Sequence, residues 1–433
     1  MRKWTKMLGT LGLSLGILAA CGNGNTDGGT ASVPADEQVN LDIFNIKVET
    51  RDQLEELVAR YEELNPHVNI SVTTVGGGAD APAALQARFA AGTMPSIFML
   101  GGLSDVELWE DQLLDVADTD AARAAIDGTL DGATLNGVVR GLPYNIEGFG
   151  WLINKEIFEQ AGINPDSISS FDEFEAAVRK IDSMKDDLGL DAVFAFSGGE
   201  NWVVSQFSSH FASYAYNNEV GAVADAAVID WGGAEAFLQK YTDLINEFSI
   251  QPIITVDYSM AVEDLFVNGR VAMTHQGNWV VPTLDAIDPT FSTERLGILP
   301  FFVADNGTTG TIAAGPSWFW GVNRNADEAV IEESINFLNW LYTSEEGKER
   351  MIRDFGFIPA YTGNDSDMIT DPVSKRIYEM LAAGQVTPWS HNSYPAGWFQ
   401  NGLHPQWQRY VAGQIEWDEF IQNSADAWVE ARR

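Results

Sequence analysis

The sequence is poor in cysteine, basic residues and histidine, and each shortage excludes a class of protein. Cys21 is the single cysteine among 433 residues, so neither an intramolecular disulfide nor a cysteine-rich metal centre is possible. Lys and Arg number 25 against 62 Asp and Glu, giving a net charge of −37. Such a chain lacks the basic face that nucleic acid or anionic lipid requires. The five His show no zinc-site spacing. We therefore expect no nucleic-acid partner, no metal and no cofactor.

Catalytic motifs are also missing. The chain contains no Gly-x-Ser-x-Gly elbow, no phosphate-binding loop and no dinucleotide fingerprint. Carboxylate pairs abound, but in so acidic a chain none can be singled out as a glycosidase dyad. The acidity itself is interpreted as a solvated surface that favours solubility. The sequence therefore predicts a protein that is not an enzyme.

The one cysteine stands at the end of an export signal. Arg2, Lys3 and Lys6 precede an apolar stretch at 8–20, which is too short to span a bilayer as a helix. The sequence Leu-Ala-Ala-Cys at 18–21 resembles a bacterial lipobox. We predict a signal peptide at 1–20, a lipid on Cys21, and a Gly-, Ser- and Asn-rich flexible segment over 21–40. The alternative is an ordinary secretory peptide with an incidental cysteine.

Hydrophobic residues make up 45% of the chain, and from residue 41 onward strand and helix patterns alternate. Residues 41–46 predict a strand, and 68–72 predict a second one. The helix expected at 50–64 has an apolar face at 54, 57, 58, 61 and 64, and Thr50-x-x-Gln53 predicts a capping box at its start. Ser170-x-x-Glu173 predicts a second capping box. Further strands are predicted at 97–100, 149–153, 271–274, 296–299 and 319–322. Helices are expected to close the chain at 328–341, 345–354, 372–383 and 416–430. Alternation of this kind is typical of α/β domains, and the length suggests two or three of them.

Several segments, in order, resemble the solute-binding proteins of carbohydrate ABC importers. The most specific is the passage from Gly141-Leu142-Pro143-Tyr144 to the strand, Asn-Lys and Gly-Ile of 151–163. The others are Ala-Gly-Thr-Met-Pro at 91–95, the passage at 266–279 that ends in Gly-Asn-Trp, and Phe-Ile-Pro at 357–359. Where the family usually has Asp after the Pro, this chain has Ser96. The resemblance covers residue 41 to the end of the chain.

This resemblance implies a two-lobed periplasmic-binding-protein-like α/β fold, with discontinuous lobes joined by crossover strands and a ligand cleft between them. The N-terminal lobe would comprise 41–145 plus 302–350, and the C-terminal lobe 146–301 plus 351–433. The implied function is a monomeric, lipid-anchored protein that captures a carbohydrate by hinge closure. It would deliver this ligand, expected to be an oligosaccharide, to an ABC permease in the cell membrane.

A sugar site needs flat aromatic rings for the C–H faces and polar side chains for the hydroxyls. Tryptophans next to small or polar residues at strand ends therefore become the candidates. They occur in the segments around 200, 278, 316 and 392, and the resemblance places a stacking aromatic at Trp279 and near Trp398. The predicted ligand-binding residues are Trp202, Trp279, Trp398, Glu200, Asn201, Gln276, Asn278, Lys47, Asp105, Gly315, Ser317, Trp318 and Trp389.

Seven other tryptophans lie in regular strand or helix patterns and are predicted to be structural: Trp109, Trp151, Trp231, Trp340, Trp407, Trp417 and Trp428. Two alternatives stay open for the function. The ligand could be another polar solute, such as a polyamine or a glycerophosphodiester, or the chain could be a cell-surface carbohydrate enzyme. Turnover of a glycan would favour the enzyme.

Overall fold

The computed structural model describes residues 38–76, 81–303, 310–364 and 366–433, and residues 39–433 form one unit by themselves. The predicted signal peptide, Cys21 and nearly all of the flexible segment lie outside the described residues. No helix in the described part of the chain combines the length and apolar character that a membrane span needs.

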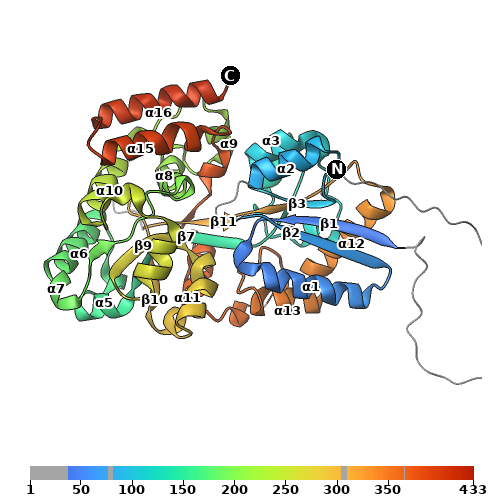
Figure 1. Ribbon diagram of the computed structural model, residues 1–433, viewed down its shortest axis with the longest axis horizontal. Coiled ribbons are helices and arrows are strands. Elements are labelled where there is room, and N and C mark those ends of the chain that lie inside the picture. The colour runs from blue at the N-terminus through green and yellow to red at the C-terminus, as the bar shows by residue number, and fades with distance from the viewer. Residues whose placement is uncertain (1–37, 77–80, 304–309, 365) are drawn as a thin grey trace, which may run out of the picture. The chain divides into compact units, whose positions relative to one another are not determined.

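The first sheet has the strand order β2-β1-β3-β12-β6. Its strands are β1 (Val39–Asn45), β2 (Val68–Thr74), β3 (Ile97–Leu100), β6 (Leu142–Pro143) and β12 (Phe319–Val322). β1 pairs in parallel with β2 and β3, whereas β12 runs antiparallel to β3. Helix α1 (Arg51–Leu64) buries Leu54, Leu57, Val58 and Tyr61 of the predicted apolar face, whereas Leu64 at its end is 44% exposed. Helices α1 and α12 (Glu328–Thr343) pack beside this sheet (Figure 1).

The second sheet has the order β13-β11-β7-β9-β8, and β10 also pairs with β7. Its strands are β7 (Ile146–Asn154), β8 (Ala192–Phe194), β9 (Val271–Gly277), β10 (Leu296–Leu299), β11 (Ile312–Pro316) and β13 (Val386–Thr387). β7 and β9 are buried at every position, because helices or neighbouring segments cover both faces of the sheet. The expected α/β fold is confirmed.

Helices, short turns and a two-stranded sheet of β4 (Thr134–Leu135) and β5 (Val138–Val139) complete the described structure (Figure 1). The remaining α-helices are α2 (Ala81–Ala90), α3 (Leu103–Trp109), α4 (Asp120–Ala124), α5 (Lys155–Gln160), α6 (Phe171–Ser183), α7 (Lys185–Leu188), α8 (Asn201–Ala215), α9 (Val220–Asp225), α10 (Glu235–Phe248), α11 (Val281–Ile287), α13 (Glu345–Arg353), α14 (Pro372–Ala382), α15 (His404–Val411) and α16 (Trp417–Ala431). Short 3-10 or π-helical segments include η2 (Val48–Thr50), η8 (Met260–Phe266), η9 (Asn278–Val280) and η12 (Ser390–Ser393).

The two predicted capping boxes had different outcomes. Ser170 caps α6 as expected, because its Oγ accepts a hydrogen bond from the backbone N–H of Glu173 at 3.2 Å. The cap predicted at Thr50 is wrong. Its hydroxyl lies 3.2 Å from the hydroxyl of Tyr144, and its side chain makes no capping bond to α1. A tertiary partner has replaced the local one.

The chain passes between the two sheets in three places. β6 leads into β7 through Tyr144, β11 leads into β12 through Trp318, and the segment at Ile358 bridges to Ile146. The passages are tied together, since the N–H of Tyr144 donates to the carbonyl of Trp318 and that of Ile146 to the carbonyl of Ile358, both at 2.8 Å. Because β11 belongs to the second sheet, we propose that the chain returns to the first lobe after residue 316 rather than at 302.

Aromatic side chains fill the core around the second sheet. Trp151 stacks against Phe301 with 5.2 Å between ring centroids, and Trp231, Trp407 and Trp428 are all at most 1% exposed. These tryptophans were predicted to be structural, and their burial confirms it. The aromatic content of the chain therefore serves mainly the core, and few indoles remain for a ligand.

Candidate functional site

A row of neighbouring aromatic rings lies where the elements of the second sheet end. Trp202 is 6.1 Å from Tyr258 and 6.5 Å from Trp279, measured between ring centroids, and Trp279 is 6.0 Å from Trp389. Tyr258, Trp202 and Trp279 are half-buried, whereas Trp389 is 8% exposed. The four rings come from segments that are far apart in sequence, and we call them the aromatic row. The fold thus brings together three of the predicted tryptophans.

Trp279 owes its position to the end of β9. Gly277 is the last residue of this strand, and a Cβ atom there would lie 2.2 Å from the ring of Trp279. The indole N–H donates to Oε1 of Gln276 at 3.0 Å, and the ring of Phe149 lies 6.0 Å away. Any side chain at 277 would displace the ring. Gln276 is fully buried and therefore orients Trp279, which differs from its predicted role as a ligand contact.

Trp202 is held by the turn that precedes α8. Its indole N–H donates to Oε2 of Glu200 at 3.2 Å, and Oε1 of Glu200 accepts from the backbone N–H of Tyr258 at 3.4 Å. Asn201, the first residue of α8, is half-buried beside them. Glu200 therefore fixes two rings of the aromatic row while remaining partly accessible itself.

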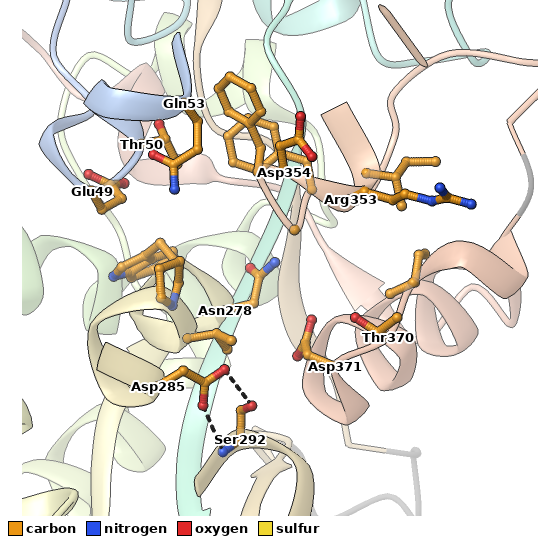
Figure 2. A pocket seen from close by; sticks show the side chains of 18 of the residues that line it. Glu49, Thr50, Gln53, Asn278, Asp285, Ser292, Arg353, Asp354, Thr370 and Asp371 are labelled. Atoms are coloured by element: carbon orange, nitrogen blue, oxygen red, sulfur yellow. Dashed lines mark hydrogen bonds between the residues drawn. The ribbon is translucent and has the colours of Figure 1, made fainter. Parts of the chain in front are cut away.

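A pocket of about 230 Å³ opens beside Trp279. Figure 2 shows Glu49, Thr50 and Gln53 on one side of it and Asn278 and Asp285 on the other. The first three follow β1, and the other two follow β9, so the pocket is lined from both sheets. The amide of Asn278 is already used, because Oδ1 accepts from the N–H of Gly148 and Nδ2 donates to Ser374. Asn278 was predicted to bind ligand, and its hydrogen bonds connect it to the scaffold.

Lys47 forms a buried ion triad with two carboxylates. Its Nζ lies 2.7 Å from Glu49 and 2.8 Å from Glu147, and Lys47 itself is 7% exposed. Burial alone would lower the pKa of Lys47, but the attraction of Glu147 and Glu49 outweighs it and raises the pKa above its ordinary value. Lys47 follows β1 and Glu147 belongs to β7, so the triad joins the two sheets beside the pocket.

Sequence reasoning missed Glu147 and Asn145, which stand at the passage between the sheets. Nδ2 of Asn145 donates to Oε1 of Glu147, and the hydroxyl of Ser317 donates to Oδ1 of Asn145, both at 3.3 Å. Ser317 is therefore part of a buried polar chain at the crossing. The available signal was the two polar residues, Asn145 and Glu147, that follow Gly-Leu-Pro-Tyr, where the resemblance had already placed the crossing.

Three further candidates do not line this pocket. They are Asp105 in α3 and, at the passage from β11 to β12, Gly315 and Trp318. Oδ2 of Asp105 accepts from the N–H of Gly101 at 2.7 Å, and burial raises the pKa of Asp105 although this bond lowers it. The ring of Trp318 packs against Gly101, and Gly315 adjoins the ring of Trp389. Asp105 therefore shapes the loop before α3, next to the ring of Trp318.

Trp398 is a correction. It was expected to be a sugar platform, but it is 1% exposed and lies in the core. Its indole N–H donates to the carbonyl of Ser424 at 2.8 Å, and its ring packs edge-on against Tyr394 and Trp428. The small residues before it had suggested an exposed loop. Instead, the segment is covered by α16, whose helical pattern gives no hint in sequence of what it covers.

Buried imidazoles lie beneath the aromatic row. His275 is fully buried, with its Nε2 3.4 Å from Nε2 of His210, and both rings pack around Phe149. Burial lowers the pKa of His275 to about 3, with a smaller contribution from His391. Burial likewise lowers the pKa of His210 well below its usual value. His275 and His210 are therefore uncharged at neutral pH, and their rings serve as packing beneath the aromatic row.

Acid should destabilise the protein through these histidines. In the unfolded chain they bind protons below a pKa of about 6.5, whereas the folded chain keeps His275 neutral down to about pH 3. The stability that these neutral histidines contribute is fully present above about pH 6.5. As the pH drops from there toward the pKa of the folded state, this contribution falls by up to about 1.4 kcal/mol per pH unit for each such group. In urea unfolding between pH 4 and 7, His275→Asn should give a shallower pH dependence than the unsubstituted chain. Equal slopes for the two proteins would contradict the prediction.

The polar groups around the aromatic row suit a neutral polyhydroxylated ligand. Partly accessible carboxylates at Glu49 and Glu200 can accept hydrogen bonds from hydroxyls, and the flat rings can cover C–H faces. Among the described residues, no three His, Cys, Asp or Glu side chains are arranged to hold a metal ion.

Comparisons of the sequence with known proteins found a matching family and similar proteins. The sequence profile described as "Bacterial extracellular solute-binding protein" matches residues 47–348. The "Multiple sugar-binding protein" of Streptococcus mutans is 23% identical over 361 residues, which is 79% of this chain and 80% of that protein.

Solved structures share the fold. A "Chitin oligosaccharide binding protein" superposes with a TM-score of 0.76 and 21% identity over 91% of this chain and 99% of that one. "SBP RafE in complex with raffinose" gives a TM-score of 0.73 and 17% identity over 92% of this chain and 100% of that one. The expected two-lobed architecture is thereby confirmed.

Proposed function

This chain belongs to the family of bacterial extracellular solute-binding proteins, and we propose that its ligand is an oligosaccharide delivered to an ABC permease. The aromatic row carries the proposal. The half-buried rings of Tyr258, Trp202 and Trp279, spaced 6.1 and 6.5 Å apart, form an apolar surface that a globular protein would otherwise cover. The printed names of relatives that bind multiple sugars and raffinose support the same ligand class.

Capture would proceed by closure of the two lobes. The pocket is lined by Glu49 and Gln53 from one side and by Trp279 and Asp285 from the other, so a ligand can contact both sides at once. A ligand that binds the closed form more tightly shifts the population toward it by that difference in affinity. Small-angle scattering should show a smaller radius of gyration with saturating ligand than without it. An unchanged curve would favour a rigid pocket.

A thermal-shift screen tests the ligand class. The probes are raffinose, maltotriose and triacetylchitotriose, with spermidine for the polyamine alternative and glycerophosphocholine for the phosphodiester. A ligand at 100 times its Kd adds about 2.7 kcal/mol of stability. We expect stabilisation by at least one trisaccharide and no hydrolysis of it on long incubation. Stabilisation by spermidine or by glycerophosphocholine alone would overturn the carbohydrate proposal, and product formation would favour an enzyme.

We also propose that the mature protein is a monomer held at the outer face of the membrane through a lipid on Cys21. The support is the lipobox-like sequence before this single cysteine. Cys21→Ala should move the protein from the membrane fraction to the soluble fraction while leaving thermal stability and glycan binding unchanged. Ser14→Ala, inside the apolar stretch, is the control. Membrane retention of Cys21→Ala would contradict the anchor.

A further inference from the structure

The two ends of the aromatic row differ. At one end, Tyr258 is half-buried, and Thr283 and Glu49 of the pocket rim are among the groups that influence the pKa of its hydroxyl. At the other end, Trp389 is 92% covered, and its ring lies against Phe149 at 5.0 Å and against Gly315. The Trp389 end of the row is therefore the covered one, whereas the other three rings are half-buried.

A direct contact between α3 and η12 lies next to the covered end. The hydroxyl of Ser104 is 3.4 Å from the carbonyl oxygen of Asn392, three residues after Trp389. Gly102 has φ of +116° and approaches so closely that a Cβ atom there would be 2.9 Å from Cβ of Asn392. Because glycine alone readily adopts this conformation, the approach depends on Gly102.

Both partners in this contact are firmly anchored to different sheets. Val106 and Trp109 of α3 are buried in the cluster with Phe98 and Phe319 of the first sheet. In η12, the hydroxyl of Ser390 is 2.7 Å from that of Ser213 in α8, which packs on the second sheet. The contact therefore connects the two lobes next to Trp389. We call its residues, Gly102, Ser104 and Asn392, the rim wall.

The covered end also holds an unused hydrogen-bond donor. Nε1 of Trp389 is buried and has no hydrogen-bond partner in the described structure. A buried donor without a partner is costly, and a ligand hydroxyl placed there would satisfy it. Trp279 uses its indole N–H within the protein, as does Trp202, so Trp389 differs from its neighbours in the row.

We propose that the protein recognises a glycan by one terminus. The terminal ring lies at Trp389, where it accepts a hydrogen bond from Nε1, and the rim wall prevents the chain from extending further. The rest of the glycan runs over Trp279 and Trp202 toward Tyr258 and the pocket. This inference rests on the proposed function, since it assigns a polarity to the same site.

Ligands blocked at one end test the polarity. The trisaccharide of the screen that binds most tightly is prepared in two forms, each with one O-benzyl group on one of its two terminal rings. One form should bind within about threefold of the parent by calorimetry, and the other should lose at least a hundredfold in affinity. Equal affinity of the two forms, whether high or low, overturns the inference. Binding by none of the three trisaccharides instead overturns the proposed function, and this inference with it.

Single substitutions test the donor. Trp389→Phe keeps an aromatic ring but removes Nε1, and it should weaken binding of that trisaccharide at least fivefold, which corresponds to about 1 kcal/mol. Trp231→Phe is the matched control, because its Nε1 is also buried without a partner but lies in the core. Its affinity should be unchanged. Equal effects of the two substitutions would show that Trp389 acts through packing alone.

A cross-link tests the rim wall without any ligand. In the Cys21→Ala chain, Ser104→Cys and Asn392→Cys should form a disulfide on mild oxidation of the free protein. With this bond, dissociation of bound trisaccharide should slow at least tenfold, and reductant should restore the original rate. Pairing of Leu108→Cys with Asn392→Cys is the control, since Leu108 is exposed on the same helix. Failure of the first pair to cross-link would overturn the wall.

Discussion

Replacing Lys47 by methionine is expected to lower the free energy of unfolding by about 3–5 kcal/mol, because it removes one partner of a buried ion triad. The side chain of Glu147 is 3% exposed, so its carboxylate would stay buried without its positive neighbour. Glu49 would lose the same partner at the edge of the pocket. Since the triad joins β1 to β7, we also expect ligand affinity to fall.

Two further variants isolate the charge effect. Lys47→Met combined with Glu147→Gln removes the buried cation together with the more deeply buried carboxylate, and it leaves Glu49 at the edge of the pocket. It should recover much of the lost stability, since an unpaired buried charge costs more than a neutral group. Arg51→Met breaks an exposed pair with Glu55 and should change stability by less than about 1 kcal/mol. Urea unfolding measures the free energy of unfolding of all three variants. If Lys47→Met matched Arg51→Met, the triad would be irrelevant to stability.

The second large effect separates two tryptophans that look alike in sequence. Trp279→Ala should weaken glycan binding at least tenfold, because truncating a buried aromatic anchor costs about 2 kcal/mol or more. Its ring is half-buried, so the melting temperature of the free protein should move little. Trp398→Ala should instead cost about 3–5 kcal/mol of stability, since it empties a packed core site.

Calorimetric titration and thermal unfolding of both variants measure this contrast. Trp279→Phe is the conservative control and should retain most of the affinity, whereas Trp398→Phe should recover only part of the stability, because the hydrogen bond to Ser424 is lost. If Trp279→Ala unfolded as readily as Trp398→Ala and its folded fraction bound glycan normally, Trp279 would be a packing residue.

The secondary structure could be predicted because it depends on local periodicity. The strands at 296–299 and 319–322 have the bounds that their apolar runs suggested, and α1 buries the predicted face except for Leu64. Ser170 caps α6 because its partner is three residues away in the chain. Thr50 has the same local pattern but bonds Tyr144, 94 residues away, and no local rule could predict this.

The site was predicted only in part, for the same reason. Trp202, Trp279 and Trp389 were chosen for their small and polar neighbours, and the fold gathers them into one row with Tyr258, which the sequence did not single out. Trp398 met the same criterion but lies beneath α16. Neighbours in sequence indicate whether a side chain can be exposed, whereas burial depends on which distant element covers it.

The sequence by itself determined the acidic charge, the absence of cysteine chemistry in the folded part, the alternation of strands and helices, and the resemblance to carbohydrate-binding proteins. Each of these depends on composition or on neighbours within a few residues. The tertiary structure alone decided that Lys47 pairs with Glu147, that Gly102 meets Asn392, and that the indole N–H of Trp389 remains without a partner. These contacts join segments 100 or more residues apart, or depend on what surrounds a buried atom, so only the folded chain brings them about.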